Sequence, residues 1–168
     1  MPAPCNPDNP DNPVAAQIIA SCEASFPAKR GDCNQFLKAA LAPFLPTAYF
    51  GDLNADGIVA LLQAPGSGWT QTREIATVIA AAQAGNVVVA GMNSTALGAA
   101  HGHVAVVVGC DGQASGTAIV PIGYAGSLGN PTAQIAGARL SGTFPASMVR
   151  SQGLDYFIRP AEMGSATA

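Results

Sequence analysis

The order of helical and strand-like patterns along the chain predicts an α+β domain. Helical patterns fill the first half and short β-branched runs fill the second, which favours an α+β domain over alternating βαβ units. At 168 residues the chain fits one domain with a substantial core, and with 49% hydrophobic and 10% charged residues its composition argues against intrinsic disorder. We expect an extended N-terminal arm over residues 1–13, a single domain over 14–160 and a frayed tail over 161–168.

The first half of the chain predicts four helices, over residues 14–22, 34–42, 56–63 and 73–84. We expect Pro27 and the turn that follows it to close off the first helix. The second carries an apolar stripe at helical spacing and ends before two prolines. In the fourth, Thr72 can cap the start, and Glu74 in the first turn complements the helix dipole.

The second half predicts short buried strands, because its β-branched runs are bounded by glycines. We expect strands over residues 87–90, 104–108, 117–122 and 156–158, with a further piece near Met148. Residues 91–100 are small and predict a flexible loop that leads into His101 and His103.

Cys33 and the histidine pair carry the chemistry that the sequence suggests. Cys33 stands at the first turn of the 34–42 helix, where the positive end of the dipole favours the reactive thiolate. A nearby imidazole would take the thiol proton and later return it to a leaving amine. His101 and His103 are the only histidines of the chain. We favour His103 as the base because it joins the rigid apolar run, and we expect His101 to contact substrate or to face water.

Several patterns allow more than one interpretation. Cys33 alone could be a small buried hydrophobic residue, and the two histidines with Cys33 could hold zinc. Residues 52–57 resemble the first half of a calcium loop, but Asn54 or Asp56 capping the 56–63 helix explains them as well.

The four cysteines also leave the disulfides open. If Cys33 stays a free thiol, three cysteines remain, so at most one internal disulfide can form among them. Cys5 and Cys22 could form it in an oxidising compartment, or all of these thiols could remain free.

Charge and hydropathy exclude several classes of partner. The formal net charge is −3 and Lys and Arg form no cluster along the sequence, so we expect neither nucleic acid nor an anionic membrane to bind. No apolar stretch approaches the roughly 18 residues that a membrane helix needs, so we expect no membrane insertion. The Pro- and Asn-rich N-terminus lacks the basic start and apolar run of a signal peptide, so export would need other machinery.

Four stretches of the sequence resemble the NlpC/P60 peptidases, a papain-like superfamily that cuts bacterial cell-wall peptides. Within that superfamily the chain most resembles the type VI secretion amidase effectors, from about Ala15 to Ile158. The first stretch departs from the family in having Asn34-Gln35 where Ser-Gly is usual. The four stretches are Gly31-Asp32-Cys33-Asn34 at the nucleophile, Gly102-His103-Val104-Ala105-Val106-Val107 at the histidine strand, Gly123-Tyr124-Ala125-Gly126-Ser127-Leu128 after it, and Leu154-Asp155-Tyr156-Phe157 at a terminal strand.

The resemblance implies a papain-like fold, with N-terminal helices on a small antiparallel sheet, and a role for each matching residue. Cys33 would be the nucleophile, His103 the base, and Asp32 a local hydrogen-bonding residue that shapes the site. The position that orients the imidazole falls near Ala125, which has no polar side chain. A backbone carbonyl or Ser127 would have to serve instead.

The resemblance further implies an antibacterial toxin without a cofactor, made in the cytoplasm and injected into the periplasm of a target cell. It would be a monomer that cleaves a peptidoglycan peptide, either between γ-D-Glu and diaminopimelate or between diaminopimelate and D-Ala. Its partners would be the secretion machinery and a cognate immunity protein. The alternatives are a non-catalytic binding protein with the same shell, or a thiol hydrolase or acyltransferase that acts on a lipid or another amide.

Overall fold

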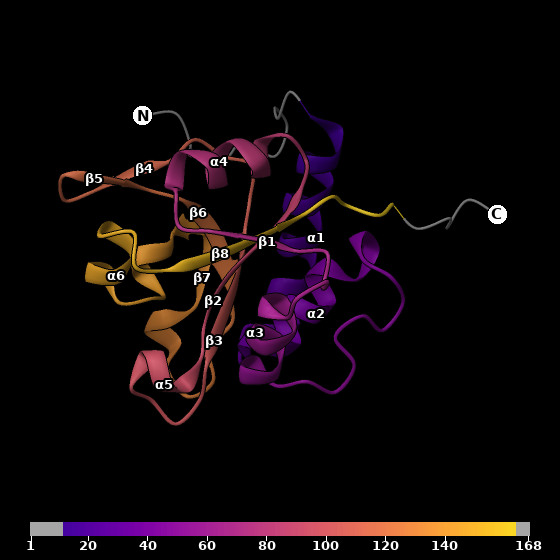
Figure 1. Cartoon of the computed structure of the whole chain (residues 1–168), viewed down its shortest axis with the longest axis horizontal. Coiled ribbons are helices and arrows are strands. Elements are labelled where there is room, and N and C mark those ends of the chain that lie inside the picture. Colours follow the sequence, from indigo (N-terminus) through magenta and orange to yellow (C-terminus); the bar gives the residue numbers. More distant parts are fainter. Residues whose placement is uncertain (1–11, 164–168) are drawn as a thin grey trace.

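An antiparallel sheet of six strands runs through the centre of the protein, with helices on both of its faces (Figure 1). The computed structural model describes residues 12–163, and its mixed architecture confirms the predicted α+β class. The strand order is β1-β8-β2-β3-β6-β7, and every neighbouring pair is antiparallel. The strands are β1 (Thr70–Thr72), β2 (Val87–Met92), β3 (His103–Val107), β6 (Ile122–Ala125), β7 (Ile135–Arg139) and β8 (Asp155–Arg159).

Both faces of the sheet are buried, which explains the uninterrupted valine run of β2. Side chains alternate between the two faces of a strand. Val87 and Val89 pack against the N-terminal helices, whereas Val88 and Ala90 belong to the core on the opposite face. The first face is covered by α1 (Pro13–Lys29), α2 (Cys33–Leu41) and α3 (Ala55–Gln63), and the second by α4 (Ile75–Gln83) and α6 (Ala146–Arg150).

The remaining elements are short. β4 (Gln113–Ser115) and β5 (Ala118–Val120) form a separate hairpin at one edge of the molecule (Figure 1). α5 (Ser94–Leu97) interrupts the connection between β2 and β3. Three 3₁₀ turns complete the description, namely η1 (Ala42–Phe44), η2 (Pro131–Ala133) and η3 (Leu140–Gly142).

The first helix is longer than predicted, because Pro27 does not end it. α1 continues to Lys29 with Pro27 inside its last turns. Beyond the predicted end at Cys22, Phe26 still packs on the core and meets the Phe36 ring edge-to-face at 5.9 Å. Burial of this aromatic side chain favours the extra turns over the break that proline alone would suggest.

Two strand predictions are also corrected. The run 117–122 is divided by Pro121 into β5 and β6, because proline has no N–H to donate to a ladder. Met148 lies in helix α6, not in a strand, and Val149 of this helix is fully buried. A single apolar pair does not distinguish a strand from one buried helical turn.

The predicted arm and tail lie mostly outside the described residues. Asn12 and Pro13, the last residues of the predicted arm, instead begin α1: the Asn12 side chain accepts the N–H groups of Val14 and Ala15. At the other end, the Glu162 N–H donates to the Phe44 carbonyl at 2.8 Å, so the first part of the predicted tail is held on the domain. Within residues 12–163, no helix combines the length and the hydropathy needed to cross a membrane.

Candidate active site

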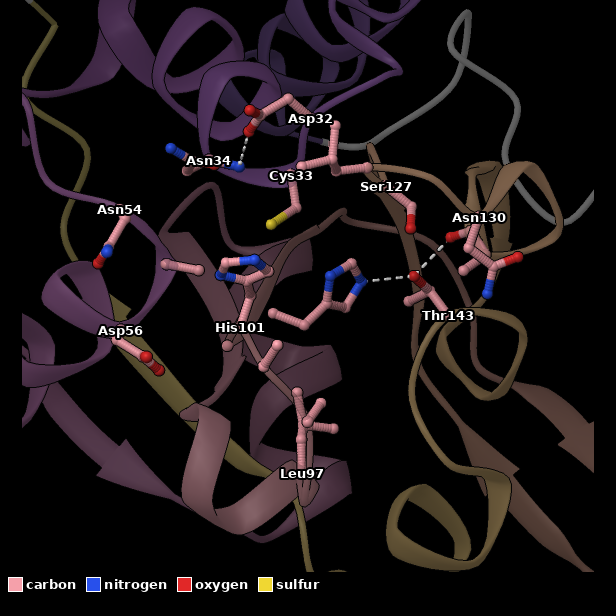
Figure 2. Close-up of a pocket in the computed structure, with 17 residues that line it drawn as sticks. Asp32, Cys33, Asn34, Asn54, Asp56, Leu97, His101, Ser127, Asn130 and Thr143 are labelled. Atoms are coloured by element: carbon pink, nitrogen blue, oxygen red, sulfur yellow. Dashed lines mark hydrogen bonds between the residues drawn. The ribbon is translucent and has the colours of Figure 1, made fainter.

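All five residues that the sequence singles out line one cleft of about 500 Å³ (Figure 2). They are Asp32, Cys33, His101, His103 and Ser127. The walls come from the start of α2, the start of α3, the segment before β3 and the residues that follow β6. Positions spread over almost the whole domain are therefore brought together at one end of the sheet.

Cys33 is the first residue of α2, and the residue before it caps the helix. The Asp32 side chain accepts hydrogen bonds from the N–H groups of Asn34 at 3.0 Å and Gln35 at 3.1 Å. Such a cap satisfies N–H groups that a helix start leaves without partners. Asp32 therefore fixes the start of the helix that carries Cys33. In Figure 2 the Cys33 thiol points from the helix start into the cleft.

Close backbone packing holds the start of α2 against the sheet. Helix α2 packs against β3, and the backbone N–H of Val104 in that strand favours the thiolate form of Cys33, which lowers the thiol pKa. At Gly126, just after β6, an added Cβ atom would lie 2.6 Å from the Asp32 carbonyl oxygen. The next residue, Ser127, donates its N–H to the Arg30 carbonyl at 2.9 Å. The helix start and the end of β6 can approach this closely only because residue 126 has no side chain.

His103 opens β3, and its imidazole is fixed by Thr143. The Nε2 atom lies 2.6 Å from the Thr143 hydroxyl oxygen, and this hydroxyl lies 2.6 Å from the Ala133 carbonyl oxygen. A carbonyl can only accept, so the hydroxyl proton goes to Ala133 and the Thr143 oxygen accepts the proton on Nε2. This tautomer leaves Nδ1 of His103 as a free acceptor. The His103 ring also contacts Phe144 edge-to-face at 4.9 Å.

Thr143 is the site residue that the sequence did not indicate. It follows a 3₁₀ turn, forty residues after His103, and no motif marks it. The sequence pointed to the neighbourhood of Ala125, to a backbone carbonyl or to Ser127. Ser127 lines the cleft and is 9% exposed, but the hydrogen-bond partner of Nε2 is Thr143. In Figure 2 a dashed line that ends on Thr143 marks this hydrogen bond.

The segment before the histidines is anchored at several points, although its small residues predicted a flexible loop. Its first part belongs to β2 and to α5. The Asp56 carboxylate accepts the Ser94 N–H at 2.6 Å, and an added Cβ at Gly102 would lie 2.6 Å from the same oxygen. His101 is exposed and lines the cleft, and it precedes the strand that begins at His103.

Burial sets the protonation states of the two candidate catalytic groups. Desolvation raises the pKa of the Cys33 thiol above its usual value, and the N–H groups of Val104 and Asn34 offset this only in part. Desolvation also lowers the pKa of His103 to about 4. The helix start was expected to favour a thiolate. The structure corrects this: at neutral pH the resting pair is a thiol and a neutral imidazole.

The possible calcium loop has another explanation in the structure. Asn54 caps α3 by accepting the Gly57 N–H at 2.9 Å, and one oxygen of Asp56 is bonded to the Ser94 N–H. Within the part of the chain that the structure describes, no three His, Cys, Asp or Glu side chains lie together in a way that could hold a metal ion.

Of the two possibilities that the sequence left open, a Cys5–Cys22 disulfide or free thiols, the structure excludes the disulfide to Cys22. Cys22 is a free thiol buried in the helical core, whereas Cys110 is disulfide-bonded, and Cys5 lies outside the described residues. Cys33 is also free, as a nucleophile must be.

Fold and cleft together define an α+β protein in which a free cysteine and a histidine with a fixed tautomer line one cavity. No model of a known protein family matches the chain, and no curated protein is significantly similar to it in sequence.

Proposed function

We propose that the protein is a papain-like cysteine hydrolase of the NlpC/P60 type that cleaves amide bonds in peptidoglycan peptides. The observation that carries this proposal is the hydrogen bond between His103 Nε2 and Thr143. It leaves Nδ1 as the unprotonated nitrogen, in a cleft that also holds the free thiol of Cys33. A buried imidazole needs a hydrogen-bond partner in any role, so the support for catalysis lies in Nδ1 being left as the acceptor while His103 and Cys33 line the same cleft.

The first half of the reaction forms a thioester. As Cys33 Sγ attacks the amide carbonyl, Nδ1 of His103 takes the thiol proton, so general-base catalysis compensates for the high thiol pKa. The N–H of Cys33 lies at the positive end of α2. Asp32 accepts the N–H groups of the next two residues, so in this proposal the Cys33 N–H is the donor left to stabilise the oxyanion. His103 then protonates the leaving amine, and the C–N bond breaks.

The second half releases the product. His103 takes a proton from a water molecule, the hydroxide oxygen attacks the thioester carbonyl, and the C–S bond breaks. The sulfur recovers its proton from His103, which regenerates the starting pair and leaves a carboxylic acid. Throughout, Thr143 keeps Nε2 engaged, so that Nδ1 remains the nitrogen that exchanges protons.

The substrate and the biological setting rest on the resemblance to type VI secretion amidase effectors. In this proposal the protein is a monomeric toxin that acts in the periplasm of a target cell and is held inactive in the producing cell by an immunity protein. The disulfide at Cys110 supports work in an oxidising compartment. Two scissile bonds are compatible with the proposal, from γ-D-Glu to diaminopimelate and from diaminopimelate to D-Ala.

Digestion of purified Gram-negative peptidoglycan tests the proposal. We would compare wild type with Cys33→Ser, using Cys22→Ala as the matched loss of a buried thiol outside the cleft. We expect wild type and Cys22→Ala to release new peptides, whose masses identify the bond, and Cys33→Ser to release none. If wild type releases nothing under reducing conditions, or if Cys33→Ser remains active, the hydrolase proposal fails and a binding protein becomes the better explanation.

A further inference from the structure

A second pocket, of about 290 Å³, is lined by two arginines that lie eleven residues apart in the sequence. It is formed by the β4–β5 hairpin, β7, η3 and α6, and Arg139 and Arg150 both line it. We propose that this pocket binds an oxyanion, either a carboxylate or a phosphate group. The inference is independent of the hydrolase proposal, because it concerns other residues and another cavity.

Adjacent residues of β4 anchor the two guanidinium groups. Arg139 donates from Nη1 to the Ala114 carbonyl at 2.7 Å, and Arg150 donates from Nε to the Ser115 hydroxyl at 2.9 Å. Each guanidinium has five N–H donors. One donor on each group fixes its place, and the remaining donors are available to a ligand.

No carboxylate of the described residues neutralises this pair. The ion pairs within residues 12–163 join Arg73 to Asp155 and Arg159 to Glu162. Both arginines are exposed, so solvent screens their mutual repulsion, and the attraction for an anion comes from the two unpaired positive charges and their remaining donors. An anion in the pocket would compensate both charges. Guanidinium groups are also the side chains best suited to two-point recognition of carboxylate and phosphate oxygens.

A chain of hydroxyl groups adds a further donor to the pocket. Ser115 is only 2% exposed, and its hydroxyl accepts from Arg150 and donates to the Ser141 hydroxyl at 3.0 Å. Ser141 lines the pocket, and its own proton has no acceptor among the described residues. The pocket therefore presents mainly donors. A ligand that only accepts hydrogen bonds matches this surface, whereas a neutral amide or sugar would leave the two charges without compensation.

Titration of the full chain with three small probes tests the proposal. Backbone amide shifts would be followed by NMR while inorganic phosphate, acetate or a short peptide with a free C-terminal carboxylate replaces chloride at constant ionic strength. We expect saturable shifts around residues 114–116 and 139–142. Arg150→Gln and Arg139→Gln should each weaken binding roughly tenfold, as expected when a charge-assisted hydrogen bond is lost. Arg30→Gln, which changes an exposed arginine elsewhere, should leave binding unchanged.

The probes also identify the source of the anion. Saturation by phosphate alone assigns the pocket to phosphate groups, and saturation by acetate and by the free peptide, but not by the amidated peptide, assigns it to carboxylates. Ser141→Ala keeps both arginines and should weaken binding less than either arginine change. Two results would overturn the proposal: no saturable shift with any probe, or the same loss of binding in Arg30→Gln as in Arg150→Gln.

Discussion

Replacing Gly126 with alanine is expected to separate the two halves of the candidate active site. The added Cβ would lie 2.6 Å from the Asp32 carbonyl oxygen and 2.9 Å from that of Lys29. Ordinary contacts begin at 3.4 Å, so the backbone before α2 or the end of β6 has to move by about 0.8 Å. Both obstructing atoms are backbone atoms, which cannot rotate away as a side chain would.

The structure sets the size of the expected effect. Overpacking of a tight core contact costs about 1–3 kcal/mol of the free energy of unfolding. A catalytic group displaced by about 1 Å loses activity on the order of 100-fold. Because the displaced segment carries Cys33 whereas His103 stays on β3, we expect peptide release to fall by about this factor even under conditions where the variant is fully folded.

Gly31→Ala is the matched control for Gly126→Ala. Gly31 lies in the same turn before α2, but an added Cβ there meets no atom within 4 Å. Urea unfolding would measure stability, and the rate of peptide release from peptidoglycan would measure activity. The reasoning is refuted if Gly126→Ala matches Gly31→Ala in both measurements, because the close approach would then have no structural or catalytic consequence.

Two further predictions concern His103. Thr143→Val keeps the shape of the side chain but leaves Nε2–H without its acceptor, which costs about 1–3 kcal/mol of stability and should lower kcat more than it changes KM. Thr143→Ser should restore both the stability and kcat. Equal kcat in wild type, Thr143→Val and Thr143→Ser would contradict the positioning role. The pKa of His103 is about 4 in the folded protein and 6.5 in the unfolded chain, so as the pH falls the unfolded chain takes up the histidine proton before the folded protein does. A contribution on the order of 3 kcal/mol to the free energy of unfolding is therefore present above pH 6.5 and is lost as the pH falls to 4. Urea unfolding across this range should show the slope in wild type and in His101→Gln but not in His103→Gln, and an unchanged slope in His103→Gln would assign it to other groups.

Local patterns made the cysteine and the histidine strand predictable from sequence. A cap residue followed by a helical stripe positions Cys33, and a β-branched run positions His103, so neither required knowledge of distant contacts. The hydrogen bond from Thr143 could not be predicted in the same way. It depends on how η3 folds back beside β3, and η3 is a short turn in a segment without periodicity. The two arginines of the second pocket were missed for the same reason, since they are adjacent only through β4.

The packing that positions the candidate catalytic pair also keeps it uncharged at rest. The Cys33 thiol is buried where α2 packs against β3, and burial disfavours both the thiolate and the imidazolium. The N–H groups of Val104 and Asn34 act on the thiol pKa in the opposite direction but do not outweigh burial. Charge separation is therefore expected to develop only as the thiol attacks a carbonyl, when the oxyanion forms next to the N–H of Cys33 at the helix start. A tautomer fixed in advance by Thr143 matters most in such a mechanism, because the proton has to move to Nδ1 during the attack itself.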